Sequence, residues 1–284
     1  MSTETGMEKV TDWITLWKEL VEKQGPFWNC KKRSEENMDK WKDRAKGFYD
    51  RVKKRWLKPD PHRDFIISQI SSVKDATILD IGAGTGAWAL LLSKYVRKVT
   101  AIEPSYEMRH ILEENIQKEG CNNIEVLDQF WPIPDIARHD FSLASHSVYG
   151  CENLHDFINA MTLTTKHTCF MLLRAPDYNG IMAKAANRIW GQPNDSPNFQ
   201  VAYNAMLQMG LFPNVLMEEN YMWPGWINEN LDDAFDQIRS RFGLEGESIH
   251  DPFLMELLNK NLREKDGKVQ WPSELRTGLV YWNT

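Results

Sequence analysis

One ten-residue stretch limits the possible folds of this chain more than any other. The segment LDIGAGTGAW, residues 79–88, places three glycines in five positions directly after an apolar run. A strand that ends in glycines and opens a helix presents free backbone N–H groups and the positive end of the helix dipole. Glycine is needed because any Cβ would block the close approach of a ligand. The stretch therefore predicts a strand, loop and helix arranged around a bound nucleotide.

Short β-rich runs alternate with helical patterns from Thr77 onward. TILDIG, KVTAIE and NIEVLD predict three strands, separated by helices over AWALLLSKY and EMRHILEENIQKEG. HDFSLASHSVYG and HTCFMLLRAP predict a fourth and a fifth strand, NVLMEENYMW a sixth and RTGLVYWN a seventh. Such a series predicts an α/β fold whose parallel sheet carries its ligands at the carboxyl ends of the strands.

The first 70 residues show helical patterns and no strand. In DKWKDRAKGFYDRVKKRW, large or apolar residues recur at spacings of three and four, with Lys and Arg on the opposite face. Pro59 and Pro61 end this amphipathic helix, and FIISQI begins another. We expect residues 1–70 to form a helical cover and residues 71–284 to form one domain with a helical insertion at about 228–265.

Composition and charge exclude several classes of protein. No apolar run approaches the roughly 18 to 20 residues of a membrane helix, and the polar N-terminus lacks a signal-peptide core, so we expect a cytoplasmic protein without a membrane partner. Residues 1–70 hold 16 Lys+Arg against 12 Asp+Glu, and the rest holds 18 against 28, so charge does not require a polyanionic partner. The cysteines form no C-x-x-C pair, which predicts neither a metal site nor a disulfide framework; they are Cys30, Cys121, Cys151 and Cys169.

Spacing alone leaves two nucleotide chemistries open for the glycine loop. Read as G-x-G-x-x-A from residue 82, it matches a dinucleotide fingerprint, and Glu103 lies where an acid takes ribose hydroxyls. NAD is therefore not excluded. However, Gly86 adds a third alternate glycine, and Asp80 stands inside the strand where a dinucleotide fold usually has an apolar residue. No clear substrate domain of the kind a dehydrogenase needs follows the third strand.

Three motifs together carry a more specific resemblance. LDIGAGTG, AIEPS at the second strand and VLDQFWPIP at the third resemble the first three motifs of class I S-adenosylmethionine-dependent methyltransferases. The resemblance is closest to the small-molecule group that includes ubiquinone/menaquinone-type enzymes, and it covers roughly residues 77–174. It implies S-adenosylmethionine as cofactor and a Rossmann-like, seven-stranded, mostly parallel sheet with helices on both faces and an antiparallel last strand beside the sixth.

The resemblance also implies roles for individual residues. The loop glycines would pass under the methionine carboxylate and ribose, Asp80 would organise the loop, and Glu103 would accept both ribose hydroxyls. Asp128 would take the adenine amino group, with Met108 and Phe130 or Trp131 against the ring. The family often has a small residue after the Asp, where this chain has Gln129 and Phe130. The cofactor-binding prediction comprises Asp80, Gly82, Ala83, Gly84, Gly86, Glu103, Pro104, Met108, Asp128, Gln129, Phe130, Ser145 and Tyr49.

Tyr49 enters this set through a lid. RAKGFYDRV resembles the N-terminal helix that closes over the cofactor with a Tyr in many relatives, and Tyr49 is the matching position. Phe48 and Trp41 compete for the same helical face. A lid of this kind would exclude water and shape the pocket.

Catalytic candidates must lie at the ends of the fourth and fifth strands. The sulfonium methyl is already activated, so the protein mainly aligns an in-line displacement and removes a proton when needed. His146 is the leading base candidate because imidazole titrates near neutral pH, and Tyr149 would lie near the substrate. Arg174, Asp177 and Tyr178 follow the fifth strand, where they would orient a charged substrate.

The segments around this edge are rich in tryptophan. Of the 12 Trp residues, those concerned are Trp28, Trp41, Trp56, Trp190, Trp223, Trp226 and Trp271. They predict a deep aromatic pocket for a flat or apolar acceptor, or for a cation held over ring faces, with Trp190 as a substrate contact.

Other acceptors and functions stay open at this point. A nucleic-acid enzyme is disfavoured because SHSVYG lacks the Asn or Asp, two prolines and aromatic of amino-directed DNA enzymes, and because the body of the chain is acidic. An RNA or protein methyltransferase, a cofactor binder without turnover and an NAD-dependent enzyme are the alternatives. We expect methyl transfer to a small-molecule acceptor, which releases S-adenosylhomocysteine, by a monomer or homodimer.

Overall fold

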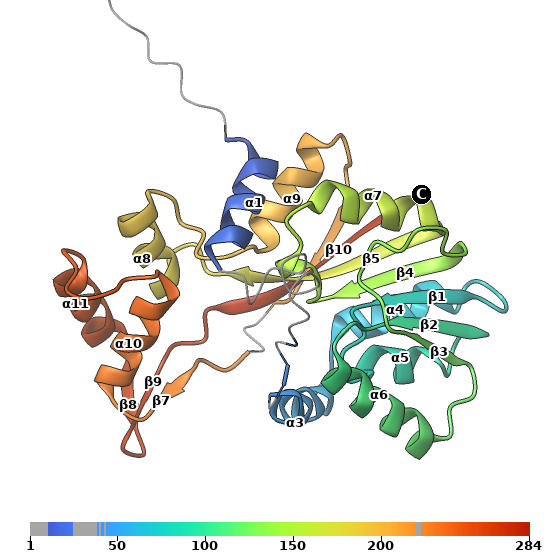
Figure 1. The fold of residues 1–284 in the computed structure, drawn as a ribbon, viewed down its shortest axis with the longest axis horizontal. Helices are drawn as coiled ribbons and strands as arrows, with labels where there is room; N and C mark the ends of the chain where they lie inside the picture. The colour runs from blue at the N-terminus through green and yellow to red at the C-terminus, as the bar shows by residue number, and fades with distance from the viewer. Residues whose placement is uncertain (1–10, 25–38, 40, 43, 220–222) are drawn as a thin grey trace, which may run out of the picture.

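The computed structural model describes residues 11–24, 39, 41–42, 44–219 and 223–284 (Figure 1). A seven-stranded sheet runs in the order β3-β2-β1-β4-β5-β10-β6. β1 to β5 are parallel to their neighbours, and β10 is antiparallel to both β5 and β6. The strands are β1 (Thr77–Ile81), β2 (Lys98–Ile102), β3 (Ile124–Leu127), β4 (His139–Ser145), β5 (Thr165–Pro176), β6 (Asn214–Met217) and β10 (Leu275–Asn283). The predicted fold class, including the antiparallel last strand beside the sixth, is confirmed.

Helices cover both faces of this sheet (Figure 1). Successive residues of β1 point to opposite faces, so Leu79 and Ile81 belong to one hydrophobic core and Ile78 to the other. All five β1 residues are buried, as expected for a parallel strand covered on both sides. The first face carries α1 (Trp13–Lys23), α7 (Leu154–Thr164) and α9 (Phe199–Gln208); the second carries α4 (Pro61–Ile70), α5 (Ala87–Leu92) and α6 (Tyr106–Glu119).

The N-terminal helices are tied to the sheet domain. The Trp17 indole of α1 donates to the Cys151 carbonyl at 2.8 Å. α4 begins at Pro61, earlier than the FIISQI pattern, because the Asp60 side chain caps its first turn. The amphipathic helix predicted before it is α3 (Ala45–Trp56), which contacts α6. Trp28 and Cys30 lie outside the described residues, and a boundary at residue 70 stays a prediction.

A third core lies beside the sheet, at the left of Figure 1. It joins α8 (Ile181–Trp190) to the insertion helices α10 (Leu231–Arg241) and α11 (Asp251–Asn261). The predicted insertion also holds a small sheet that we did not expect, with strands β7 (Ile227–Asn228), β8 (Arg263–Lys265) and β9 (Lys268–Gln270) in the order β7-β9-β8. Strands of two or three residues are too short to show an alternating pattern.

Two further details differ from the sequence prediction or complete the fold. β6 ends at Met217, so only the first part of NVLMEENYMW is a strand, and residues 220–222 lie outside the described part. A 3-10 turn, η1 (Val148–Gly150), follows β4. Among the described helices, none is long and apolar enough to cross a bilayer.

Candidate functional site

The glycine loop joins β1 to α5 in backbone geometry that requires glycine. Gly82 and Ala83 donate their N–H groups to the Ile102 carbonyl at 2.8 and 2.9 Å, which fixes the loop against β2. Gly82 has φ +73°, and a Cβ there would lie 2.4 Å from the Ser147 Cβ. Gly84 also has a positive φ, of +58°, but a Cβ there would meet nothing within 4 Å. The loop is therefore closed on the Gly82 side and open above Gly84.

Two buried carboxyl groups lie beside the loop. Glu103 follows β2, and its Oε2 accepts the Gly84 N–H at 2.7 Å while its Oε1 accepts the Ser105 N–H at 2.9 Å. Asp80 Oδ2 is buried without a hydrogen-bond partner. Burial, together with the Glu103 charge, raises the pKa of Asp80 to about 7. A buried polar atom without a partner is unusual in a native fold.

This loop fits the cofactor that the sequence motifs imply. The orphaned Asp80 oxygen and the open backbone above Gly84 both suit a polar ligand that lies over the loop. The Glu103 carboxylate lies beside the same loop, and an ionised carboxylate offers about four acceptor positions. Pro104 follows it at the end of β2. Their contacts with a ligand stay predictions.

The end of β3 holds the residues predicted to contact adenine. Asp128 forms a two-pronged ion pair with Arg109, with oxygen–nitrogen distances of 2.8 and 2.7 Å, and its carboxylate is exposed. Met108 is buried at the start of α6. Gln129 is exposed and Phe130 is half-buried. The Trp131 indole instead donates to the Phe157 carbonyl at 3.2 Å, so that ring is packed against α7.

The predicted lid helix is attached to the glycine loop through one asparagine. The Tyr49 hydroxyl of α3 donates to Asn115 Oδ1 at 3.1 Å, and Asn115 Nδ2 donates to the Thr85 carbonyl at 3.0 Å. Trp41 and Phe48, which the sequence placed in competition with Tyr49, pack against each other at 4.8 Å. The chain of bonds ties the lid to the loop whose backbone is open at Gly84.

A second set of side chains meets where β4 and β5 end. The Ser145 hydroxyl accepts the Trp88 indole N–H at 3.0 Å. His146 Nδ1 lies 2.9 Å from the Tyr149 hydroxyl, which also accepts the Arg174 backbone N–H at 2.6 Å. His146 has φ +55°, so its backbone is left-handed. The structure therefore brings together the two predicted catalytic residues and a predicted substrate residue.

Positive charge surrounds this histidine. Burial, together with the nearby Arg55 and Arg174, lowers the pKa of His146 to about 3. Burial raises the pKa of Tyr149. His146 is consequently neutral at neutral pH and able to accept a proton, while Tyr149 keeps its own.

Arg55 is a site residue that the sequence did not reveal. Its position on α3 was assigned to a basic, solvated face, but its guanidinium lies 3.9 Å from the Trp223 ring centroid and pairs with Glu218 at 3.3 Å. The indole N–H of Trp223 donates to the Thr277 hydroxyl at 3.1 Å. These partners are more than 160 positions away along the chain, so no local pattern could identify them.

An aromatic cavity of about 130 Å³ opens beside Arg174. It lies between the end of β5 and the start of β10, and three of the predicted tryptophans line it, namely Trp223, Trp226 and Trp271. Of the other predicted substrate residues, Tyr178 is 68% exposed and does not line this cavity. Trp190 does not line it either; its ring packs on Phe242 at 4.8 Å.

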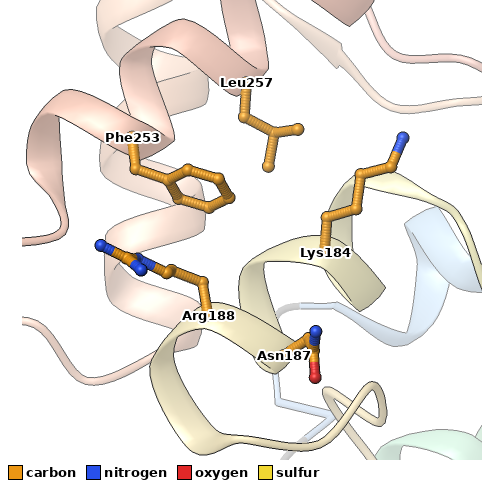
Figure 2. Close-up of a pocket in the computed structure, with 5 residues that line it drawn as sticks. All are labelled: Lys184, Asn187, Arg188, Phe253 and Leu257. Atoms are coloured by element: carbon orange, nitrogen blue, oxygen red, sulfur yellow. The ribbon is translucent and has the colours of Figure 1, made fainter.

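A separate hollow lies on the insertion, between α8 and α11 (Figure 2). Its lining residues are Lys184, Asn187, Arg188, Phe253 and Leu257. It contains no residue from the end of a sheet strand and no predicted site residue. Nor do the described residues gather three His, Cys, Asp or Glu side chains in a way that could hold a metal.

Comparisons with known proteins match the first half of the sheet. A family model described as a methyltransferase domain matches residues 78–167. The chain is similar to an uncharacterized methyltransferase of Staphylococcus carnosus, 32% identical over 85 residues, which cover 30% of this chain and 38% of that protein. It is also similar to a probable ribosomal RNA small subunit methyltransferase A of Methanosphaera stadtmanae, 39% identical over 69 residues, which cover 24% of this chain and 26% of that protein.

The sequence matches cover only part of the relatives, whereas the similarity in fold covers most of this chain. The matched part spans less than half the length of the curated relatives. The solved structure of the YcgJ protein from Bacillus subtilis is similar in fold, with a TM-score of 0.52 and 14% identity, covering 78% of this chain and 97% of that one. The matched sequence ends at β5, so Arg174 and the tryptophan-lined cavity lie beyond it.

Proposed function

We propose that this chain, which carries a class I S-adenosylmethionine-dependent methyltransferase domain, transfers a methyl group to a small-molecule acceptor and releases S-adenosylhomocysteine. The observation that carries the proposal is the open glycine loop with two buried carboxyl groups beside it. An orphaned buried carboxylate oxygen is a costly feature for a loop that binds nothing.

The residues of the loop would hold the cofactor by backbone and carboxylate contacts. When bound, S-adenosylmethionine supplies an electrophilic methyl group. Glu103 would accept the ribose hydroxyls, the open backbone at Gly84 would lie under the ligand, and Asp80 would hydrogen-bond through its free oxygen. Tyr49 would hold the lid helix over the same loop through Asn115.

On the acceptor side, the chain would position a nucleophile and receive its proton. Neutral His146 accepts a proton only by gaining charge between two guanidinium groups, which suits transient rather than stable protonation. In the tautomer whose Nδ1–H donates to the Tyr149 hydroxyl oxygen, Nε2 carries the lone pair that would receive the proton. Arg174 and the tryptophan cavity would orient that acceptor.

A small molecule suits this site better than a polymer. The cavity beside Arg174 is about 130 Å³, of the order of the engineered cavities that hold a single benzene ring. Residues beyond 70 carry the net negative charge noted above, which opposes a nucleic-acid backbone. We expect a cytoplasmic enzyme that acts as a monomer or homodimer. RNA or protein methylation, cofactor binding without turnover and NAD-dependent chemistry are the alternatives.

Calorimetric titration with S-adenosylhomocysteine and, in parallel, with NAD tests the proposal. We expect S-adenosylhomocysteine to bind and NAD not to bind. Glu103→Ala should weaken binding about 100-fold, because it removes charged hydrogen bonds worth roughly 1.5–3 kcal/mol each. Glu113→Ala is the matched control, since Glu113 is an exposed glutamate on α6. Binding of NAD alone, or of neither compound, would refute the cofactor assignment.

A further inference from the structure

Arg174 differs from the other charged groups that line the tryptophan cavity. The carboxylates there are engaged: Asp195 pairs with Arg241 at 2.9 Å, and Glu274 accepts the Ile181 N–H at 2.8 Å. Asp177 accepts the Asn179 N–H at 2.9 Å. No carboxylate among the described residues forms an ion pair with the Arg174 guanidinium, and its Nε is buried without a hydrogen-bond partner.

The surroundings hold this guanidinium in place without neutralising it. It lies over the Tyr149 ring, with its central carbon 4.1 Å from the ring centroid. Its Nη2 donates to the Pro197 carbonyl at 3.4 Å, and the side chain also hydrogen-bonds the Tyr149 hydroxyl; both partners are neutral. Removing a charge from water without a counter-ion is expensive, and arginine presents a planar fork of donors that matches a carboxylate. The described residues therefore leave this charge without a counter-ion, which an anionic ligand would supply.

The opposite wall of the cavity is aromatic. Trp226 and Trp271 meet edge to face at 5.2 Å, and Trp223 lies alongside them. A flat apolar ring suits such a wall. Three acidic side chains also line the cavity, and they would repel a doubly charged phosphate more strongly than a single carboxylate.

We infer that the methyl acceptor is a ring-sized molecule bearing a carboxylate, which Arg174 binds while the ring packs against the three tryptophans. The inference rests on the proposed function, because it identifies the acceptor of that same site. Arg174 is well placed for this task, since its own N–H bonds the Tyr149 hydroxyl that holds His146. Trp223, which lines the cavity, also meets the His146 ring edge to face, with ring centroids 5.7 Å apart.

The test uses the full chain saturated with S-adenosylhomocysteine and two series of matched probes. The indole series is indole-3-acetate, indole-3-acetamide and tryptamine, and the phenyl series is phenylacetate, phenylacetamide and phenethylamine. Calorimetry should show each acid binding at least about 10-fold tighter than its amide, a difference of about 1.4 kcal/mol, with the amine weakest. Phenyl phosphate should bind less tightly than phenylacetate.

Three variants test whether Arg174 causes the preference for the acid over the amide. Arg174→Gln should abolish the preference of acid over amide, and Arg174→Lys should retain part of it because the charge remains without the fork. Arg188→Gln, in the hollow between α8 and α11, should leave the preference unchanged (Figure 2). Normal S-adenosylhomocysteine binding by each variant would show that it is folded.

The outcomes separate the two proposals. Equal binding of acid and amide, tighter binding of the amine or the phosphate, or no binding of any acid would overturn the inference while S-adenosylhomocysteine binding upholds the cofactor assignment. Failure of S-adenosylhomocysteine itself to bind would overturn the proposed function and, with it, the inference that depends on it.

Discussion

The two halves of the sheet edge are built in opposite ways. In the half formed by β1 to β3, backbone groups and carboxylates meet a loop with open space above Gly84, and the parts come from about 50 consecutive residues. In the half formed by β4, β5 and β10, arginine and aromatic side chains from α3, β5 and the insertion converge on His146. The first half is suited to one fixed ligand. In the second half, the identity of the ligand depends on side chains that come from distant parts of the chain.

The same contrast holds for charge. Burial is the main cause of both pKa shifts: it raises the pKa of Asp80, with the Glu103 carboxylate acting in the same direction, and it lowers the pKa of His146, with the cations Arg55 and Arg174 acting in the same direction. Both shifts favour the neutral form of a buried group. At neutral pH His146 is therefore uncharged and Asp80 is only partly ionised.

The largest loss of stability should follow from adding one methyl group to the glycine loop in the first half of the sheet edge. Gly82→Ala adds a Cβ that would lie 2.4 Å from the Ser147 Cβ, at a positive φ. We expect a loss of about 4 kcal/mol in the free energy of unfolding, from left-handed strain and overpacking together. Chemical denaturation measures it, and S-adenosylhomocysteine affinity should fall at least about 100-fold because the loop must shift.

Gly120→Ala is the control for strain without a clash. Gly120 has a similar φ of +66°, but a Cβ there would meet nothing within 4 Å. It should cost only about 1–2 kcal/mol and leave the affinity unchanged. Equal losses for the two variants would mean that contact between Gly82 and Ser147 does not shape the loop.

The next effect concerns the charge of Asp80, in the same half of the sheet edge, and the pH dependence of stability that it causes. Because Asp80 has a folded-state pKa of about 7 against an ordinary value of 3.8, the folded protein keeps a proton that the unfolded chain has lost between these pH values. Its contribution to stability therefore falls as pH rises from about 4 to 7. Asp80→Asn should remove that fall, so the variant should gain about 4 kcal/mol relative to the parent between pH 4 and pH 8.

Unfolding of the ligand-free protein across this pH range measures the difference. Asp75→Asn, at an exposed aspartate before β1, should follow the parent at every pH. If Asp80→Asn and the parent show parallel pH profiles, the carboxyl of Asp80 is charged in the folded protein and the contrast with His146 fails.

The smallest loss of stability should come from a change in the second half of the sheet edge, at Tyr149. Tyr149→Phe leaves the Arg174 N–H without its acceptor and His146 without its partner. We expect a loss of about 2 kcal/mol in the free energy of unfolding, as for buried groups deprived of a hydrogen bond. S-adenosylhomocysteine affinity should stay within about 2-fold, since the change lies outside the glycine loop.

Tyr203→Phe is a suitable comparison, because Tyr203 stacks on Phe199 in α9 and its hydroxyl has no partner among the described residues. That variant should unfold like the parent. A large loss of S-adenosylhomocysteine affinity in Tyr149→Phe would show instead that the two halves act as one site.

The comparison also explains how far the sequence could predict this molecule. The succession of strands and helices from β1 to β5 and the need for glycine at position 82 follow from local patterns, because neighbouring residues form these elements and the loop, whereas the antiparallel last strand was implied by the family resemblance. Arg55 could not be predicted, since its position depends on Glu218 and Trp223, which are distant in sequence. Trp131 was predicted as one of two adenine contacts, but its indole is used to pack against α7.

Between β6 and β10 the chain leaves the sheet and returns to the adjacent antiparallel strand, where Met217 pairs with Gly278. In topology the whole connection from residue 218 to residue 274 is therefore one long hairpin loop, and all three cavity tryptophans belong to it. Such a loop can be lengthened, shortened or grafted without rethreading any strand. A single exchange would replace most of the aromatic wall and leave the glycine loop untouched, which makes this connection a natural point for the evolution, or the engineering, of new specificity.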